Sequence, residues 1–170
     1  MLKSAPPPSK HHFGHNRLGY TLIEILVGMS IIGLIFSFGY LSYRDFSRRQ
    51  SLASSVRRLK ADLSLAQEKA LSGEKPSSTA CSGDGALNGY DFYADSNSTY
   101  ILQANCVGGL IDDKTVQVSN EITLTAVPNR ITFKVIGKGT NLTDSATITL
   151  TQAATGDTQV ITVSSEGEIK

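Results

Sequence analysis

The sequence has few of the residues that catalysis and metal binding most often use. It has no tryptophan, only two cysteines and only three histidines. The three histidines all lie near the start, at His11, His12 and His15. Everything after His15 therefore lacks the base of a Ser-His-Asp triad and the imidazole ligands of a zinc site. Adjacent acids at Asp112 and Asp113 are more typical of solvated turn residues than of a calcium site. We expect no catalytic residue, no metal and no cofactor.

Proline is absent between Pro8 and Pro76, and charge is almost absent from Tyr20 to Tyr43, where Glu24 is the single charged residue. A helix over these 24 residues would be about 36 Å long, against a hydrocarbon core of about 30 Å. We therefore predict a transmembrane helix over 20–43 rather than a buried soluble helix.

The segment before the apolar run is polar, rich in proline and basic, and the run begins only after Gly19. A secretory signal peptide has its cleavage site after the apolar stretch, not before it. Removal of residues 1–19 would thus leave the apolar helix on the product. An acid, Glu24, lies near the start of this helix, where an apolar residue would be expected.

Beyond Tyr43 the apolar residues recur at helical spacing. The stripe consists of Leu52, Val56, Leu59, Leu63, Ala66 and Ala70, while Arg57, Arg58, Lys60, Asp62, Gln67 and Lys69 fall off it. Gly73 and Pro76 are typical of a helix end. We predict one helix from Thr21 to Leu71, with a membrane half (20–43) and an amphipathic half (44–72).

The remaining residues, 73–170, predict a β-rich head. Short runs rich in Thr, Val, Ile and Tyr alternate with turn residues. The expected strands are 90–94, 99–104, 115–118, 121–126, 131–136, 146–151 and 159–164. The fold class is α+β: a long N-terminal helix packed on an antiparallel β-sheet head.

A family resemblance enters at the start of the apolar run. The hexapeptide Gly19-Tyr20-Thr21-Leu22-Ile23-Glu24 resembles the processing motif of type IV pilins and pseudopilins, with Tyr where the usual form has Phe or Met. The resemblance implies cleavage between Gly19 and Tyr20 by a prepilin peptidase, and N-methylation of the new amine of Tyr20. It also implies the pilin fold.

The same resemblance implies a place and partners. It suggests a single-pass protein of the inner membrane, with a cytoplasmic N-terminus and an extracytoplasmic head, that later joins a filament. Its partners would be other pilins or pseudopilins, the prepilin peptidase and the inner-membrane assembly platform. Glu24 would pair with the amine of Tyr20 on a neighbouring subunit and so set the assembly register. The alternative is that Glu24 is merely tolerated near the membrane surface.

Segments of the second helix half and of the head resemble one group within the pilin and pseudopilin family. The segments "LASSVRRLKADLSLAQEKAL", "ITFKVIGKG" and "TQVITVSSEGEI" resemble the pseudopilin H / FimT group, which includes type II secretion pseudopilins and minor type IV pilins. Cys81 and Cys106 can pair in an extracytoplasmic head, or remain two free thiols.

The net charge of the head helps to decide whether this protein binds DNA. Residues 76–170 carry five bases and ten acids, a net charge of −5, and a negative head repels nucleic-acid phosphates. DNA binding by this subunit is therefore not expected. The alternatives are a tip-displayed binding module, such as an adhesin or DNA-uptake minor pilin, and a membrane-anchored enzyme. The residues do not separate secretion from pilus function, nor a minor from a major subunit.

Overall fold

The computed structural model describes residues 19–78, 81 and 86–170, and for 37–42 it describes the backbone only. Most of the expected leader, 1–19, thus lies outside the described residues. The chain divides into two compact units, Met1–Leu41 and Ser42–Lys170, and each is considered by itself.

The first element is a helix of 51 residues, α1 (Leu22–Ser72). It ends at Ser72, one residue beyond the predicted end. Gly73, which was predicted to end the helix, follows directly. Gly73 has φ +65°, and its N–H bonds to the carbonyl of Ala70, while the N–H of Glu74 bonds to that of Lys69. These two bonds form a Schellman motif, in which a left-handed glycine satisfies the last carbonyls of a helix.

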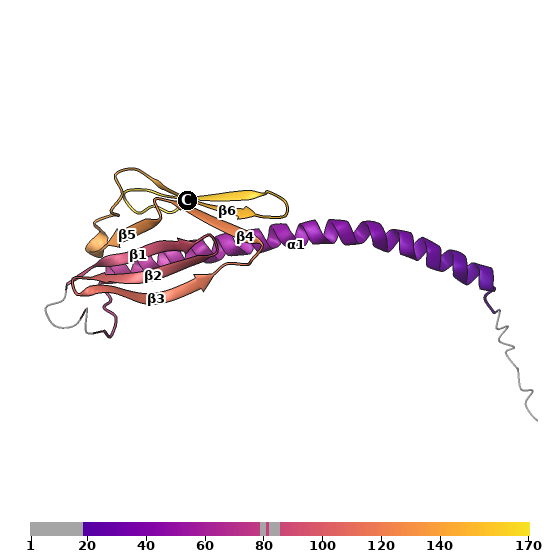
Figure 1. Ribbon diagram of the computed structural model, residues 1–170, viewed down its shortest axis with the longest axis horizontal. Coiled ribbons are helices and arrows are strands. Elements are labelled where there is room, and N and C mark those ends of the chain that lie inside the picture. The colour runs from indigo at the N-terminus through magenta and orange to yellow at the C-terminus, as the bar shows by residue number, and fades with distance from the viewer. Residues whose placement is uncertain (1–18, 79–80, 82–85) are drawn as a thin grey trace, which may run out of the picture. The chain divides into compact units, whose positions relative to one another are not determined.

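Seven strands follow the helix and form two antiparallel sheets. The first sheet has the order β3-β2-β1-β5, and the second has the order β4-β6-β7 (Figure 1). The bounds are β1 (Leu87–Ser96), β2 (Thr99–Cys106), β3 (Gly109–Gln117), β4 (Ile122–Val127), β5 (Arg130–Lys134), β6 (Ala146–Gln152) and β7 (Thr158–Val163). The predicted α+β class, a helix with an antiparallel head, is confirmed.

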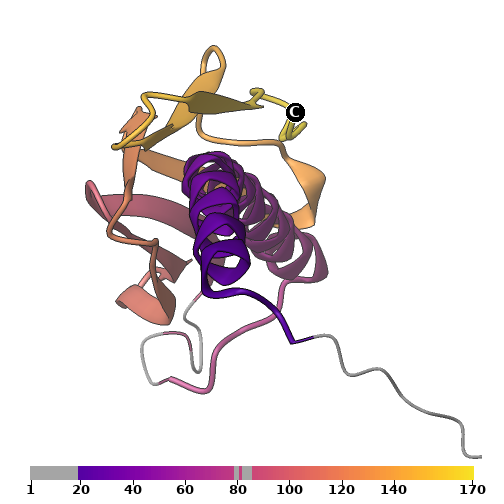
Figure 2. The ribbon, with the colours of Figure 1, turned by 90° about the vertical axis from the view of Figure 1, so that its right-hand side faces the viewer.

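Both sheets share one core with the second half of α1. The predicted apolar stripe faces this core: Leu59 and Leu63 are fully buried, and Leu52, Ala66 and Ala70 nearly so. They pack with Tyr90, Phe92, Tyr100 and Phe133 of the first sheet, and with Leu124, Ile148, Leu150 and Ile161 of the second. Figure 2 looks along the helix and shows strands around its magenta second half.

The prediction for the third strand was wrong in its start and in the role of two acids. β3 begins at Gly109, not at residue 115, so Asp112 and Asp113 lie in a strand and not in a turn. The polar run hides this strand because it lacks apolar alternation. Its pairing with β2 shifts register between Leu102 and Gln103, and a bulge of this kind re-aims the extra residue of the longer strand.

The fifth strand is shorter than predicted. β5 ends at Lys134, and a 3₁₀ turn, η2 (Val135–Gly137), follows. Ile136 has φ +58° and Gly137 has φ +67°. Two successive left-handed residues cannot continue a strand, so the backbone leaves the sheet two residues before the predicted end.

Candidate functional site

The motif that carries the family resemblance lies at the start of α1. Gly19, Tyr20 and Thr21 precede the helix and are exposed. Tyr20 keeps 78% of its surface accessible. A peptidase requires an exposed segment that can adopt an extended conformation, and the Gly19–Tyr20 bond has these properties.

Thr21 and Glu24 also have a local structural role. The Thr21 Oγ1 atom accepts a hydrogen bond from the backbone N–H of Glu24 at 3.3 Å, so Thr21 is the N-cap of α1. A Thr followed three residues later by Glu is the spacing of a capping box. An acid in the first turn also interacts favourably with the helix dipole. This capping role was not predicted from the sequence, although the Thr-x-x-Glu spacing signals it.

The first turns of α1 expose apolar side chains on every side. Those that are at least half exposed are Leu22, Ile23, Ile25, Leu26, Met29, Ile31, Ile32, Leu34, Ile35 and Phe36. Soluble monomers rarely expose a continuous apolar surface of this kind. An exposed apolar surface of this kind is typical of a segment that contacts lipid or another protein.

A shallow groove of about 320 Å³ runs along one face of this segment. Tyr20, Glu24 and Gly28 line it at intervals of four residues, together with Ile25, Met29 and Ile32. A Cβ atom added at Gly28 would meet nothing within 4 Å. The groove therefore places the Glu24 carboxylate beside a position where a second helix can approach closely.

No helical stretch within the described residues has both the length and the apolarity needed to cross a membrane.

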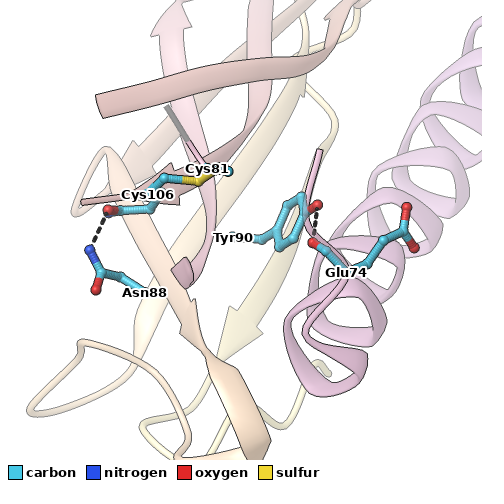
Figure 3. Close-up of a disulfide and its surroundings, with 6 residues drawn as sticks. Glu74, Cys81, Asn88, Tyr90 and Cys106 are labelled. Atoms are coloured by element: carbon cyan, nitrogen blue, oxygen red, sulfur yellow. Dashed lines mark hydrogen bonds between the residues drawn. A yellow bond between two sulfur atoms is a disulfide. The ribbon is translucent and has the colours of Figure 1, made fainter. Parts of the chain in front are cut away.

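The two cysteines form a second candidate site, in the head. Cys81 and Cys106 are joined as a disulfide with a Cα–Cα distance of 5.4 Å, and both are buried. Figure 3 shows this bond near the strand that carries Tyr90, whose hydroxyl donates to the Glu74 carbonyl at 2.8 Å. Both contacts attach the connection that follows α1 to the first sheet.

A polar network that was not predicted from the sequence joins α1 to the first sheet. Asp62, which was predicted to lie off the apolar stripe, is 5% exposed. Its carboxylate accepts hydrogen bonds from the Tyr100 hydroxyl and from Lys114 Nζ, both at 2.6 Å. Burial, and then the bond to Asp62, raise the pKa of Tyr100, so Tyr100 stays protonated as the donor.

Two helical turns after Asp62, a second ion pair joins α1 to β3. Here the helix supplies the base, Lys69, and the strand supplies the acid, Asp113. Lys69 Nζ lies 2.8 Å from a carboxylate oxygen of Asp113. Burial opposes the charge of Lys69, but the bond to Asp113 and the nearby negative groups outweigh it and raise its pKa. Because of the bulge in β3, Asp113 and Lys114 both reach α1 although they are adjacent. No group of three or more metal-binding side chains occurs among the residues that the structure describes.

Comparison with known proteins gives a family match at the start of the chain. No curated protein and no solved structure matches the chain significantly. The model of the prokaryotic N-terminal methylation motif matches residues 14–40, which contain the Gly19–Tyr20 bond, the N-cap and the exposed apolar turns described above. The chain therefore carries the type IV prepilin-like methylation motif, which supports its placement among the pilins and pseudopilins.

Proposed function

We propose that this chain is a pilin-like structural subunit, a minor pilin or pseudopilin H-like component, of a type IV pilus or a type II secretion pseudopilus. One observation carries the proposal: the methylation motif over residues 14–40 coincides with an exposed Gly19–Tyr20 bond and a helix start whose large apolar side chains are exposed. The same motif favours a structural subunit over an enzyme.

Processing would act on the residues before the helix. Cleavage between Gly19 and Tyr20 removes the basic leader and makes Tyr20 the new N-terminus, where methylation leaves a secondary amine that is still protonated near neutral pH. The apolar segment that follows would hold the subunit in the inner membrane, with the leader on the cytoplasmic side and the head outside.

Assembly would use the groove at Gly28. A neighbouring helix seated there brings its own N-terminal amine towards the Glu24 carboxylate. In a low-dielectric environment an isolated carboxylate is costly, and a paired one much less so. The pair would therefore permit one axial position of the neighbour and disfavour the others. The other partners would be the prepilin peptidase and the inner-membrane assembly platform.

Glu24→Gln tests whether the charge of Glu24, and not its capping role, is required. Glutamine also suits the third helical position of a capping box, so the helix start is retained while the carboxylate is lost. We expect normal cleavage before Tyr20 and at least about a tenfold loss of incorporation into filaments, because one partner of a buried pair is missing. Mass spectrometry of the N-terminus and quantitation of the subunit in sheared filaments measure the two steps.

Glu24→Asp, which keeps the charge, is the matched control and should retain part of the incorporation. Wild-type incorporation of the Gln variant would show that Glu24 serves only as a cap. A wild-type chain that retains its initiator methionine in cells and never enters a filament would refute the proposed function itself.

A further inference from the structure

A groove of about 580 Å³ lies between the second half of α1 and the start of β7. Its floor is apolar, formed by Leu52, Ala53 and Val56, and Arg49 and Arg57 line it from the helix. Asp157, beside the start of β7, lies 3.4 Å from Arg49. No ion pair with Arg57 occurs in the portion of the chain that the structure describes. The groove therefore offers an apolar floor with one available positive charge.

The other wall of the groove is an open sheet edge. β7 is the last strand of its sheet. Lys170 covers its second half, where the Thr162 N–H donates to the Lys170 carbonyl at 3.2 Å and the Lys170 N–H donates to the Thr162 carbonyl at 2.9 Å. Backbone groups alternate between the two sides of an antiparallel strand. The backbone N–H and C=O groups of Thr158 and Val160 thus point to the outer side of β7, as those of Thr162 do. Thr158 and Val160 are both exposed.

An open edge beside an apolar floor and an unpaired arginine suits an extended segment with an apolar residue and an acid. The chain itself contains such a segment in β3, the edge strand of the other sheet. Leu110 is 46% exposed and Asp112 is also exposed. Asp112 uses its Oδ1 atom to accept a bond from Gln103 at 2.7 Å, which leaves its other oxygen for a cation.

The spacings agree. Leu110 and Asp112 are two residues apart, so they lie on one face of β3, about 6.8 Å from each other. Ala53 and Arg57 are four residues apart on one face of α1, about 6.0 Å from each other. A strand laid along the helix with Leu110 over Ala53 would thus bring Asp112 to Arg57.

The overall charge agrees as well. Residues 44–75 carry eight bases and four acids, a net charge of +4, whereas residues 76–170 carry −5. The helix of one copy and the head of another therefore attract each other. Since the two surfaces differ, the contact is heterologous and can repeat from copy to copy into an open filament.

We infer that the groove formed by α1 and the exposed start of β7 receives strand β3 of a second copy, with Leu110 on the apolar floor and Asp112 paired with Arg57. The inference rests on the proposed function, because assembly would bring the copies together. It adds a contact between heads to the contact between N-terminal helices.

Cysteine cross-linking in whole cells tests the contact directly. Two differently tagged full-length copies are expressed together, one with Ala53→Cys and one with Leu110→Cys, and a short bis-maleimide is added. The native cysteines are joined to each other and do not react. We expect a covalent dimer that carries both tags. Ala53→Cys with Val127→Cys, an exposed position (68%) outside the proposed contact, is the control and should give none.

Charge reversal supplies the second test. Arg57→Asp or Asp112→Arg alone should lower the cross-linked yield about fivefold, and the two together should restore it. Arg58→Asp is the matched control and should not be rescued by Asp112→Arg. Equal cross-linking for both cysteine pairs, or no recovery in the double reversal, overturns the inference.

The N-terminal mass and the filament content of the same cells keep this outcome separate from that of the proposed function. Subunits that are cleaved and incorporated but not cross-linked would refute the contact alone. Cross-linked subunits that are never cleaved or incorporated would refute the function alone.

Discussion

At the residue scale, the buried pair of Asp62 and Tyr100 shows how a polar contact is placed within an apolar interface. Burial of a carboxylate is costly unless it is paired and hydrogen-bonded. Asp62 meets this condition because Tyr100 and Lys114 both donate to it at 2.6 Å. Since only one position of the helix on the sheet satisfies these bonds, the pair selects the register of α1.

The raised pKa of Tyr100 predicts alkaline sensitivity of the head. The unfolded chain releases this proton near pH 10, whereas the folded chain retains it, so the stabilisation is complete below about pH 10 and is lost as the pH rises above that value. The urea midpoint of the wild type should fall between about pH 9.5 and 11.5. In Tyr100→Phe the decline should be shallower, and an equally steep decline would assign it to other groups.

Ile136 is strained where it stands. It is a β-branched residue with φ +58°, a region that costs such residues about 1–2 kcal/mol, and it is 77% exposed. Ile136→Asn should therefore raise the free energy of unfolding by about 1 kcal/mol, since asparagine tolerates this backbone with little strain. Urea denaturation followed by circular dichroism measures the change. A loss of stability would instead indicate that the Ile136 side chain makes a stabilising contact.

At the element scale, the bulge in β3 allows the polar residues of this strand to contact α1. It lets Asp113 and Lys114 reach α1 together, against Lys69 and Asp62. The signs alternate, so a shift of the helix by two turns would place like charges opposite each other. The β3 run and α1 are therefore matched by charge.

The disulfide between Cys81 and Cys106 ties the connection after α1 to the end of β2. The two residues are separated by 25 positions, and a closed loop of that size stabilises a fold by about 3–4 kcal/mol in the chain-entropy model. We expect a loss of this order when a reductant is added. Denaturation curves with and without reductant measure it, and alkylation with mass spectrometry verifies the redox state. Identical curves would indicate that the bond does not form in solution.

At the scale of the whole molecule, every buried apolar residue that the structure describes lies in the second unit. The described buried apolar residues begin at Leu52, while the exposed apolar turns lie before residue 37. A chain of residues 42–170 should therefore fold without residues 1–41 and remain soluble. Circular dichroism and size-exclusion chromatography test this. Aggregation or an unfolded spectrum would show that the first unit is needed for folding.

Much of this organisation was predictable from local patterns. The helical spacing of Leu52, Leu59 and Leu63 predicted the buried stripe, because side chains three and four residues apart share one face. Gly73 predicted the helix end, because a left-handed residue is needed there. Runs rich in Thr, Val, Ile and Tyr predicted the presence of all seven strands, although not the start of β3. The motif from Gly19 to Glu24 predicted the methylation match, because its chemistry depends on adjacent residues.

The sequence by itself thus determined the α+β order, the stripe, the strands and the N-terminal motif, all of which depend on residues close together along the chain. Only the tertiary structure decided that Asp62 is buried, that β3 begins at Gly109 and that the α1–β7 groove exists. The burial of Asp62 depends on Tyr100, 38 positions away, and the contacts of the polar β3 run with the helix include Lys69 with Asp113, 44 positions apart. The groove depends on residues still further apart, such as Arg49 and Asp157. No local pattern encodes such a pairing, because the free energy that stabilises it arises only once the chain has folded.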